Sequence, residues 1–171
     1  MGQGGETSCP IRAATGYPMP DLDDTDRRLL RVLQRDATLS TQELAERAGL
    51  SASPAWRRVR RMTDEGVIAA QVVLVPPRAL GLSALAYVQV SLLDHREETI
   101  AAFDRFVQAE DQVVECATIT GASDYLLKIV AEDAEGLERF LMRRLLATGI
   151  IRATVTNFVL RQTKYTTALP V

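Results

Sequence analysis

The sequence is poor in the side chains that catalysis, metal binding and covalent cross-linking use. It holds 2 Cys, 1 His and 1 Trp in 171 residues, and 5% of its residues are aromatic. Cys9 and Cys116 stand far apart, so their spacing fits no disulfide framework, zinc site or Cys-x-x-Cys redox pair. No Ser-His-Asp set and no Walker loop can be assembled, and His95 is expected in an exposed polar loop. We therefore expect no catalytic residues, no metal and no cofactor.

Long apolar runs and a strong charge of one sign are missing as well. No run approaches the roughly 18 apolar residues of a membrane span, and residues 1–20 lack the apolar centre of a signal peptide. We therefore expect a cytoplasmic protein that makes no membrane contact. The formal net charge of −2 excludes a protein that coats nucleic acid through bulk positive charge. Contact with an anionic partner therefore has to be local.

One stretch, residues 51–66 (SASPAWRRVRRMTDEG), concentrates positive charge. Ser51 and Ser53 are good helix N-caps, and Pro54 suits a first turn because its missing N–H would have no intrahelical partner there. Gly66 is typical of the position just past a helix C-terminus. The stretch therefore predicts a helix with four arginines along its length.

The helical period divides this stretch into two faces. At about 100° per residue, Trp56, Val59 and Met62 share one face, which we predict to be buried in a core. The outer side carries Ser53, Pro54, Arg57 and Arg61, flanked by Arg58 and Arg60. Arg57 and Arg61 are best aimed at the major groove of DNA, where arginine binds guanine O6 and N7.

Two roles are open for each of the other polar residues of the stretch. Arg58 and Arg60 are expected on phosphates or in salt bridges with neighbouring acids. Ser51 and Ser53 either contact phosphate or serve only as caps. Together with Pro54 and the two groove arginines, these residues form a candidate interface for double-stranded DNA.

Two shorter helical patterns precede the basic helix. Asp24 or Thr25 can cap a helix over TDRRLLRVLQRDA, and Ser40 with Glu43 forms an S-x-x-E capping box at the start of the second. A glycine ends the second helix a few residues before the basic one. Two helices joined by a glycine-containing turn are typical of a helix-turn-helix. Residues 67–75 are rich in β-branched residues, which predicts a short strand pair, the wing of a winged helix. A linker or a single helical turn follows at residues 78–81.

From residue 82 the pattern changes to alternating strands and helices. The expected elements are a strand at 84–92, a helix at 97–109, strands at 113–119 and 125–131, a helix at 134–146 and a strand at 151–162. The last strand changes its apolar phase between Val155 and Phe158, which predicts a β-bulge. The order β-α-β-β-α-β is that of a ferredoxin-like domain with both helices on one face. The predicted fold class is α+β, a winged helix-turn-helix followed by a ferredoxin-like βαββαβ sandwich.

The domain organisation follows from these changes of pattern. Residues 1–21, rich in Gly, Pro, Ser and Thr, are predicted to be a disordered extension. Residues 22–81 form the DNA-binding domain with its wing and linker, and residues 82–171 form the ferredoxin-like domain. Its first strand is apolar on both sides, with Val88 on one and Tyr87 on the other. A second copy of the chain is expected to cover the open, half-apolar face, which makes a homodimer.

These motifs resemble the Lrp/AsnC family, the leucine-responsive or feast/famine regulators of bacteria and archaea. The N-terminal resemblance lies in LDDTDRRLL, LSTQELAERAGLS, SPAWRRVRRM and EGVI, and the C-terminal one in VVECATITGASDYLLKIV and KYTTALPV. It covers residues 22–171. The resemblance implies a nucleoid-associated transcriptional regulator with a ligand-sensing and assembly domain. It also implies dimers that often assemble into octamers, and an amino acid as effector.

By the same resemblance, the TGASDY loop binds the effector between subunits. The residues implied are Thr118, Thr120, Gly121, Ala122, Ser123 and Asp124. Gly121 lets the backbone approach the ligand, Asp124 can pair with its ammonium group, and the loop hydroxyls can donate hydrogen bonds. Ser123 stands where the family more often has Tyr or Phe. Without the resemblance, Gly and Asp are simply what a tight hairpin connection uses.

Two other classes of function remain open. One is a nucleoid-type architectural protein that wraps DNA through its assembly and ignores small molecules. The other is an enzyme or an enzyme-regulatory subunit, because ferredoxin-like domains occur in both. The basic helix disfavours the enzyme, whereas the TGASDY loop only weakly favours a ligand-responsive regulator over the architectural protein.

Overall fold

The computed structural model describes residues 21–171, which divide into two compact units. One unit runs to Val73 and also contains Lys164–Val171, and the other spans Leu74–Thr163. The sequence places Lys164–Val171 in the ferredoxin-like domain, whereas the contacts of this segment group it with the three helices. The predicted disordered extension lies outside the described residues except for Asp21.

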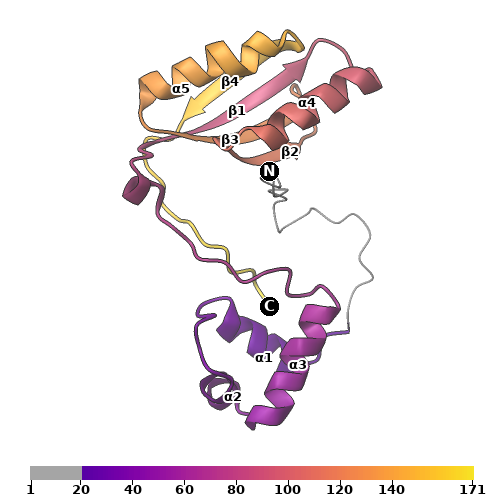
Figure 1. Ribbon diagram of the computed structural model, residues 1–171. Coiled ribbons are helices and arrows are strands. Elements are labelled where there is room, and N and C mark those ends of the chain that lie inside the picture. Colours follow the sequence, from indigo (N-terminus) through magenta and orange to yellow (C-terminus); the bar gives the residue numbers. More distant parts are fainter. Residues whose placement is uncertain (1–20) are drawn as a thin grey trace, which may run out of the picture. The chain divides into compact units, whose positions relative to one another are not determined.

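Three helices build the first unit: α1 (Asp24–Leu33), α2 (Thr41–Ala48) and α3 (Ala52–Asp64) (Figure 1). Its core consists of Leu29, Leu30, Leu44, Ala45, Ala48, Ala55 and Met62. The capping box predicted for Ser40 and Glu43 is present, and Gly49 ends α2 with a left-handed φ of 70°. Asp23, the residue before those predicted, caps α1.

The C-terminal segment, Lys164–Val171, packs against α1. Val171 contacts the three-helix core, and its backbone oxygen accepts a hydrogen bond of 2.5 Å from Arg31 Nε. The Gln34 amide donates to the Leu169 carbonyl at 3.2 Å and accepts from the Leu169 N–H at 2.6 Å. These partners are 135 to 140 positions apart, a separation that local sequence patterns cannot reveal.

The strand pair predicted for residues 67–75 is absent from the described chain. Val67 and Ile68 pack on the three-helix core, and the Ile68 N–H donates to the Met62 carbonyl at 3.0 Å. Residues 69–76 have no regular structure, and Val73 is 88% exposed. A 3-10 turn, η1 (Pro77–Leu80), follows, which confirms the single turn expected there. β-branched residues favour an extended backbone, but a strand also needs a neighbour with which to pair.

The second unit is an antiparallel sheet with two long helical segments. Its elements are β1 (Ala84–Leu92), α4 (Glu97–Ala109), β2 (Val113–Thr118), β3 (Tyr125–Ala131), α5 (Ala134–Phe140) and β4 (Ile151–Phe158). The strand order β2-β3-β1-β4 is ferredoxin-like and confirms the predicted α+β class. After α5 the helix widens into a π-helical segment, Leu141–Leu145, and ends in a 3-10 turn, Leu146–Thr148.

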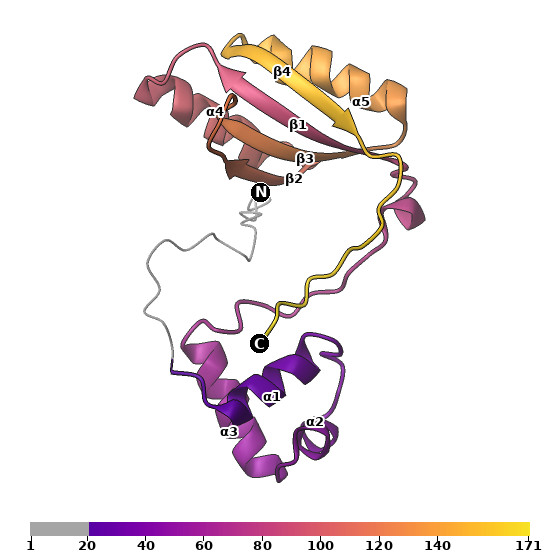
Figure 2. The same cartoon turned by 180° about the vertical axis from the view of Figure 1, so that it is seen from behind.

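Both helices cover one face of the sheet, and the opposite face is open (Figures 1 and 2). Alternate residues of β1 are buried under Phe103 of α4 and under Leu137 and Phe140 of α5. Tyr87 of β1 is only partly buried on the open face, and Val155 of β4 is 54% exposed. The open face therefore mixes apolar side chains such as Val155 with polar ones such as Gln89 and Lys128.

The predicted bulge lies at the wrong end of β4. The pairing of β1 with β4 is regular from Phe158 to Ala153 and shifts only between Ser91 and Leu92, near the start of β4. β4 also ends at Phe158 rather than at residue 162. The apolar phase change therefore reflects the end of the strand, beyond which side chains no longer alternate between two faces.

Within residues 21–171, no helix is long and apolar enough to cross a membrane. Nor do these residues contain a group of three or more His, Cys, Asp or Glu side chains that could hold a metal ion.

Candidate nucleic-acid interface and ligand loop

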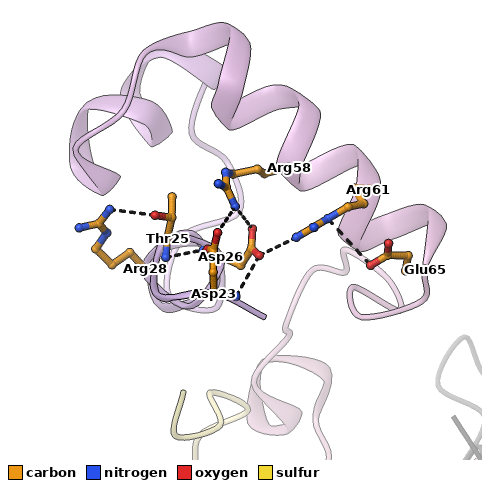
Figure 3. A network of polar contacts seen from close by, with 7 residues as sticks. All are labelled: Asp23, Thr25, Asp26, Arg28, Arg58, Arg61 and Glu65. Carbon is orange, nitrogen blue, oxygen red and sulfur yellow. Dashed lines mark hydrogen bonds and ion pairs between the residues drawn. The ribbon is translucent and has the colours of Figure 1, made fainter. Parts of the chain in front are cut away.

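Two of the four arginines of α3 turn towards α1. Arg58 Nη1 donates to Asp26 Oδ1 at 2.9 Å, and Arg61 Nη2 donates to Asp26 Oδ2 at 2.5 Å (Figure 3). The Asp26 side chain is 1% exposed. Arg61 also lies 3.9 Å from Glu65 on its own helix. The two arginines and Asp26 therefore join the start of α1 to the middle of α3.

Asp23 extends this network to the N-cap of α1. Its Oδ1 accepts hydrogen bonds from the N–H groups of Asp26 and Thr25, at 2.8 and 2.9 Å, and its Oδ2 accepts one from Arg58 at 2.8 Å. The Asp26 N–H and then Arg58 hold the pKa of Asp23 below its ordinary value. Asp26 and Asp23 in turn raise the pKa of Arg58. Asp23 and Arg58 therefore remain charged and paired at neutral pH.

The ionic network gives Arg58 and Arg61 a structural role. A buried carboxylate is stable only when charged or N–H donors satisfy it, and Asp26 takes its donors from these two arginines and the Asp23 N–H. For Arg58 this is one of the two roles predicted. For Arg61 it differs from the sequence expectation, which aimed the side chain at the major groove.

The outward side of α3 differs from the predicted one by a rotation about the helix axis. Ala55 and Met62 are fully buried, whereas Trp56, expected in the core, is 50% exposed. With Ala55 facing inward, Ser53, Arg57 and Arg60 lie on the outer side. Arg57 has no hydrogen-bond or ion-pair partner among residues 21–171. The described chain thus leaves the Arg57 guanidinium available to an external anion.

The N-terminus of α3 is open to solvent. Ser51 occupies the N-cap position, but its side chain makes no capping hydrogen bond, and no acidic residue lies in the first turn. Ser51 and Ser53 are exposed, and Pro54 lies in the first turn. A helix N-terminus with free N–H groups and a positive dipole end attracts phosphate. Of the two roles predicted for Ser51, the cap hydrogen bond is therefore not formed.

The second candidate site is the connection between β2 and β3. Gly121 has a φ of 124°, a left-handed conformation that L side chains rarely adopt. Thr118, Thr120, Gly121 and Ala122 are exposed, whereas Ser123 and Asp124 are partly buried. The Ser123 hydroxyl donates to Gln89 Oε1 at 3.4 Å, on the open face of the sheet. Of the six residues singled out in the sequence, Thr118 ends β2, and the other five lie in the connection to β3.

Asp124 is already engaged within the chain. Its Oδ2 accepts the Leu92 N–H at 2.8 Å, and its Oδ1 lies 2.8 Å from His95 Nε2. His95 and then the Leu92 N–H hold the pKa of Asp124 below its ordinary value. His95 is 69% exposed in a loop, as predicted, and it also contacts Asp124. It lies 29 positions from Asp124, and no sequence motif links the two.

The described residues include two surface hollows whose linings contain no residue of this loop. One, of 440 Å³, lies beside α5 and includes Arg139, Arg143 and Arg144 in its lining. The other, of 340 Å³, lies between α1 and the C-terminal segment. The loop's exposed residues face solvent in the single chain. A further wall is needed to enclose a ligand there.

The fold and these two sites define a class of protein, a DNA-binding regulator with a helix-turn-helix unit and a ferredoxin-like sensor unit. Residues 22–69 match the family described as winged helix-turn-helix DNA-binding, and residues 85–169 match the Lrp/AsnC ligand binding domain. The chain belongs to the Lrp/AsnC family of transcriptional regulators. The resemblance noted in the sequence is thereby confirmed.

Relatives and solved structures match over almost the whole chain. The DNA-binding transcriptional activator DecR of Escherichia coli is 33% identical over 88% of this chain and 99% of its own. The leucine-responsive regulatory protein of Salmonella typhimurium is 34% identical over 89% and 93%. A transcriptional regulator of Neisseria meningitidis, solved as a complex with L-Met, has a TM-score of 0.84 and 33% identity over 87% and 96%. The chain is accordingly a DNA-binding transcriptional regulator of the Lrp/AsnC type.

Proposed function

We propose that this regulator acts as a homodimer that places two α3 helices on DNA and alters its DNA binding when an amino acid binds at residues 118–124. The observation that carries the proposal is that the polar side chains of α3 fall into an inward-facing and an outward-facing group. Arg58 and Arg61 anchor the helix to Asp26, while Arg57 and Ser53 face outward. A helix held by a buried ionic network presents its outer donors with little further loss of conformational freedom.

On DNA, Arg57 donates to guanine O6 and N7 in the major groove. Arg60 lies on the same outer side, and Ser51, Ser53 and Pro54 approach phosphates at the helix N-terminus. Because the proposed partner is double-stranded DNA, the protein is located at the nucleoid. Each phosphate contact releases counterions, so the affinity is expected to fall linearly with the logarithm of the salt concentration.

The open face of the sheet is the proposed dimer contact. Its partly exposed apolar side chains, among them Leu85, Tyr87, Leu126 and Val155, face solvent in the single chain. A second copy would bury them by placing identical surfaces together, as a twofold axis requires. Two α3 helices related by such an axis read an imperfect palindrome, with half-sites about one helical turn apart or a multiple of that. We propose that dimers assemble further into octamers.

The effector proposed for residues 118–124 is an amino acid. The Neisseria meningitidis relative in complex with L-Met supports that chemical class. Gly121 lets the loop backbone approach the ligand, and exposed Thr118 and Thr120 can donate hydrogen bonds. Each oxygen of Asp124 already has one partner, so a ligand ammonium shares an oxygen with His95 or the Leu92 N–H, or replaces His95. The partner chain supplies the wall that the single chain lacks.

Coupling between the two sites follows from assembly. A ligand that bridges two chains binds one assembly state better than another and shifts the equilibrium by that difference in affinity. A coupling of roughly 1–3 kcal/mol changes promoter occupancy several-fold.

The test combines sedimentation and DNA binding across the twenty amino acids, with wild type, Asp124→Ala and Asp111→Ala. Asp111 is an exposed carboxylate of the same unit without a hydrogen bond or ion pair to any described residue, so it is the matched control. We expect at least one amino acid to change the mass or the DNA affinity of wild type and Asp111→Ala. Asp124→Ala should lose this response and keep ligand-free DNA binding.

The outcomes separate the competing readings. If no amino acid changes either property of wild type, the architectural protein that ignores small molecules is the better description. If Asp124→Ala responds like wild type, an amino acid is sensed at another place. If affinity for DNA is flat between low and physiological salt, α3 does not bind DNA through phosphates.

A further inference from the structure

Trp56 is a large aromatic side chain on α3, between the buried face of the helix and its outer side. It is 50% exposed and does not belong to the core that buries Ala55 and Met62 on the same helix. A single exposed apolar residue is common on protein surfaces and carries no meaning alone. Its position on the helix proposed to enter the major groove, and its contact with an arginine, give it significance.

Arg60 lies over the Trp56 ring. Its guanidinium carbon is 5.3 Å from the ring centroid, within the range of a cation–π contact. The Nε of Arg60 is 3.8 Å from Asp64 Oδ2, one turn further along the helix. Trp56 and Asp64 thus hold the Arg60 side chain along the helix surface, whereas Arg57 has no such partner in the described chain. A side chain ordered in advance loses less entropy when it binds.

We propose that Trp56 and Arg60 read a two-base step as one unit, a guanine by Arg60 and the methyl group of a neighbouring thymine by Trp56. Stacking uses the face of the guanidinium and leaves its N–H groups in the plane, where they can donate to guanine O6 and N7. The exposed part of the indole is an apolar surface, and apolar contact is how proteins recognise the thymine methyl.

This inference rests on the proposed function, because it requires α3 to lie in the major groove. It goes further by assigning specificity to a residue that the sequence placed in the core. It also changes the expectation for Arg60, from a phosphate contact or a surface salt bridge to a base contact. The two arginines that remain outward, Arg57 and Arg60, then read different positions of one half-site.

The experiment begins with selection of sites from random DNA by the full-length wild-type protein. In the selected duplex, each thymine is replaced singly by uracil, which removes only the methyl, and each guanine by 7-deazaguanine, which removes only N7. Binding is measured for wild type, Trp56→Ala, Trp56→Phe, Arg60→Ala and Arg57→Ala. Thermal unfolding of each variant confirms that the fold is kept.

We expect one thymine whose methyl removal lowers wild-type affinity about two- to fourfold, and an adjacent base pair whose 7-deazaguanine lowers it about fivefold or more. Trp56→Ala should be insensitive to that uracil, and Arg60→Ala to that 7-deazaguanine. Trp56→Phe, which keeps an apolar ring, should retain part of the uracil effect. Arg57→Ala should bind the site more weakly overall and still show both effects.

Two results would overturn the inference in distinguishable ways. If wild type selects a sequence but Trp56→Ala and Arg60→Ala respond to every modified base as wild type does, Trp56 and Arg60 do not read bases, and the proposed function stands. If wild type selects no sequence at all, the major-groove function and the inference fall together.

Discussion

Asp26 shows how one buried charge can assign roles to several neighbours. Its two oxygens accept hydrogen bonds from Arg58 and Arg61, which fixes these two guanidinium groups against α1. Arg57, only one residue from Arg58, points elsewhere because successive helical residues are about 100° apart. At this scale, one step along the helix separates an arginine bound within the fold from one that faces outward, which we propose binds DNA.

Replacing Asp26 by Asn should destabilise the helical unit by about 2 kcal/mol. This is less than the roughly 3–5 kcal/mol for breaking a fully buried ion pair, because Arg58 and Arg61 are partly exposed and screened by solvent. Urea unfolding followed by circular dichroism measures the change. Asp24→Asn removes an exposed carboxylate from the same turn and should leave the midpoint nearly unchanged. Equal midpoints for the two variants would contradict a stabilising role for the network.

Asp94, just before α4, should make the second unit sensitive to acid. Arg96 and then Thr99 lower the pKa of Asp94 from its ordinary value of 3.8 to about 2. Because the folded-state pKa is depressed, its stabilising contribution is complete above about pH 4 and disappears as the pH falls towards 2. Thermal unfolding should show Asp94→Asn below wild type at pH 7, with the difference vanishing near pH 2. Asp111→Asn, which removes a carboxylate without such partners, should show no such pH dependence.

At the scale of an element, α3 illustrates the limit of helical periodicity. Its start, its end and its amphipathic character follow from residues 51–66, and the structure confirms a helix over Ala52–Asp64. Its rotation about its own axis depends on α1 and on Asp26. A rotation of a few tens of degrees exchanges Trp56 for Ala55 in the core and takes Arg61 from the outer face to the network.

Arg57→Ala should therefore cost about 1–3 kcal/mol at a specific site and relax the base preference at one position. Arg27→Ala removes an exposed arginine of α1 and should leave the base preference unchanged. Arg61→Ala should instead lower the unfolding midpoint, because it leaves Asp26 short of a donor. Binding to a panel of single-base variants of the site measures the first effect. An equal loss on every sequence would mean that Arg57 only contacts phosphate.

At the scale of the whole molecule, segments far apart in the chain belong to the same unit. The chain passes from the helical unit to the sheet unit, and its last residues, Lys164–Val171, rejoin the helical unit on α1. Only long-range contacts show that the last residues of the chain belong to the helical unit. The open sheet face is also a feature of the whole molecule, because we propose that a second copy of the chain covers it.

Val155→Asp should weaken dimerisation on the order of 100-fold, because a carboxylate placed in an apolar interface loses its hydration without gaining a partner. Thr156→Asp is the matched control. It is the next residue of β4, pairs with Val88 on the helix-covered side of the sheet, and is already exposed. Sedimentation equilibrium should show Val155→Asp as monomer at concentrations where wild type and Thr156→Asp are dimeric. A dimeric Val155→Asp would place the contact on another surface.

Local patterns in the sequence were enough to locate the helices and the four strands of the sheet. Alternation in β1, the capping box at Ser40 and the position of the TGASDY loop all act over a few residues, and the structure confirms each of them. The order of strands and helices also sufficed for the ferredoxin-like class, because right-handed crossovers leave few alternatives.

Only the tertiary structure decided which side chains meet across the fold. The pairing of His95 with Asp124, of Arg61 with Asp26 and of Gln34 with Leu169 joins residues 29 to 135 positions apart. Residues 67–75 likewise form no strand in the described chain, and Val67 and Ile68 pack on the three-helix core instead. Local propensity is a property of neighbouring residues, whereas helix rotation, strand pairing and ion-pair partners are set by the packing of distant segments against one another.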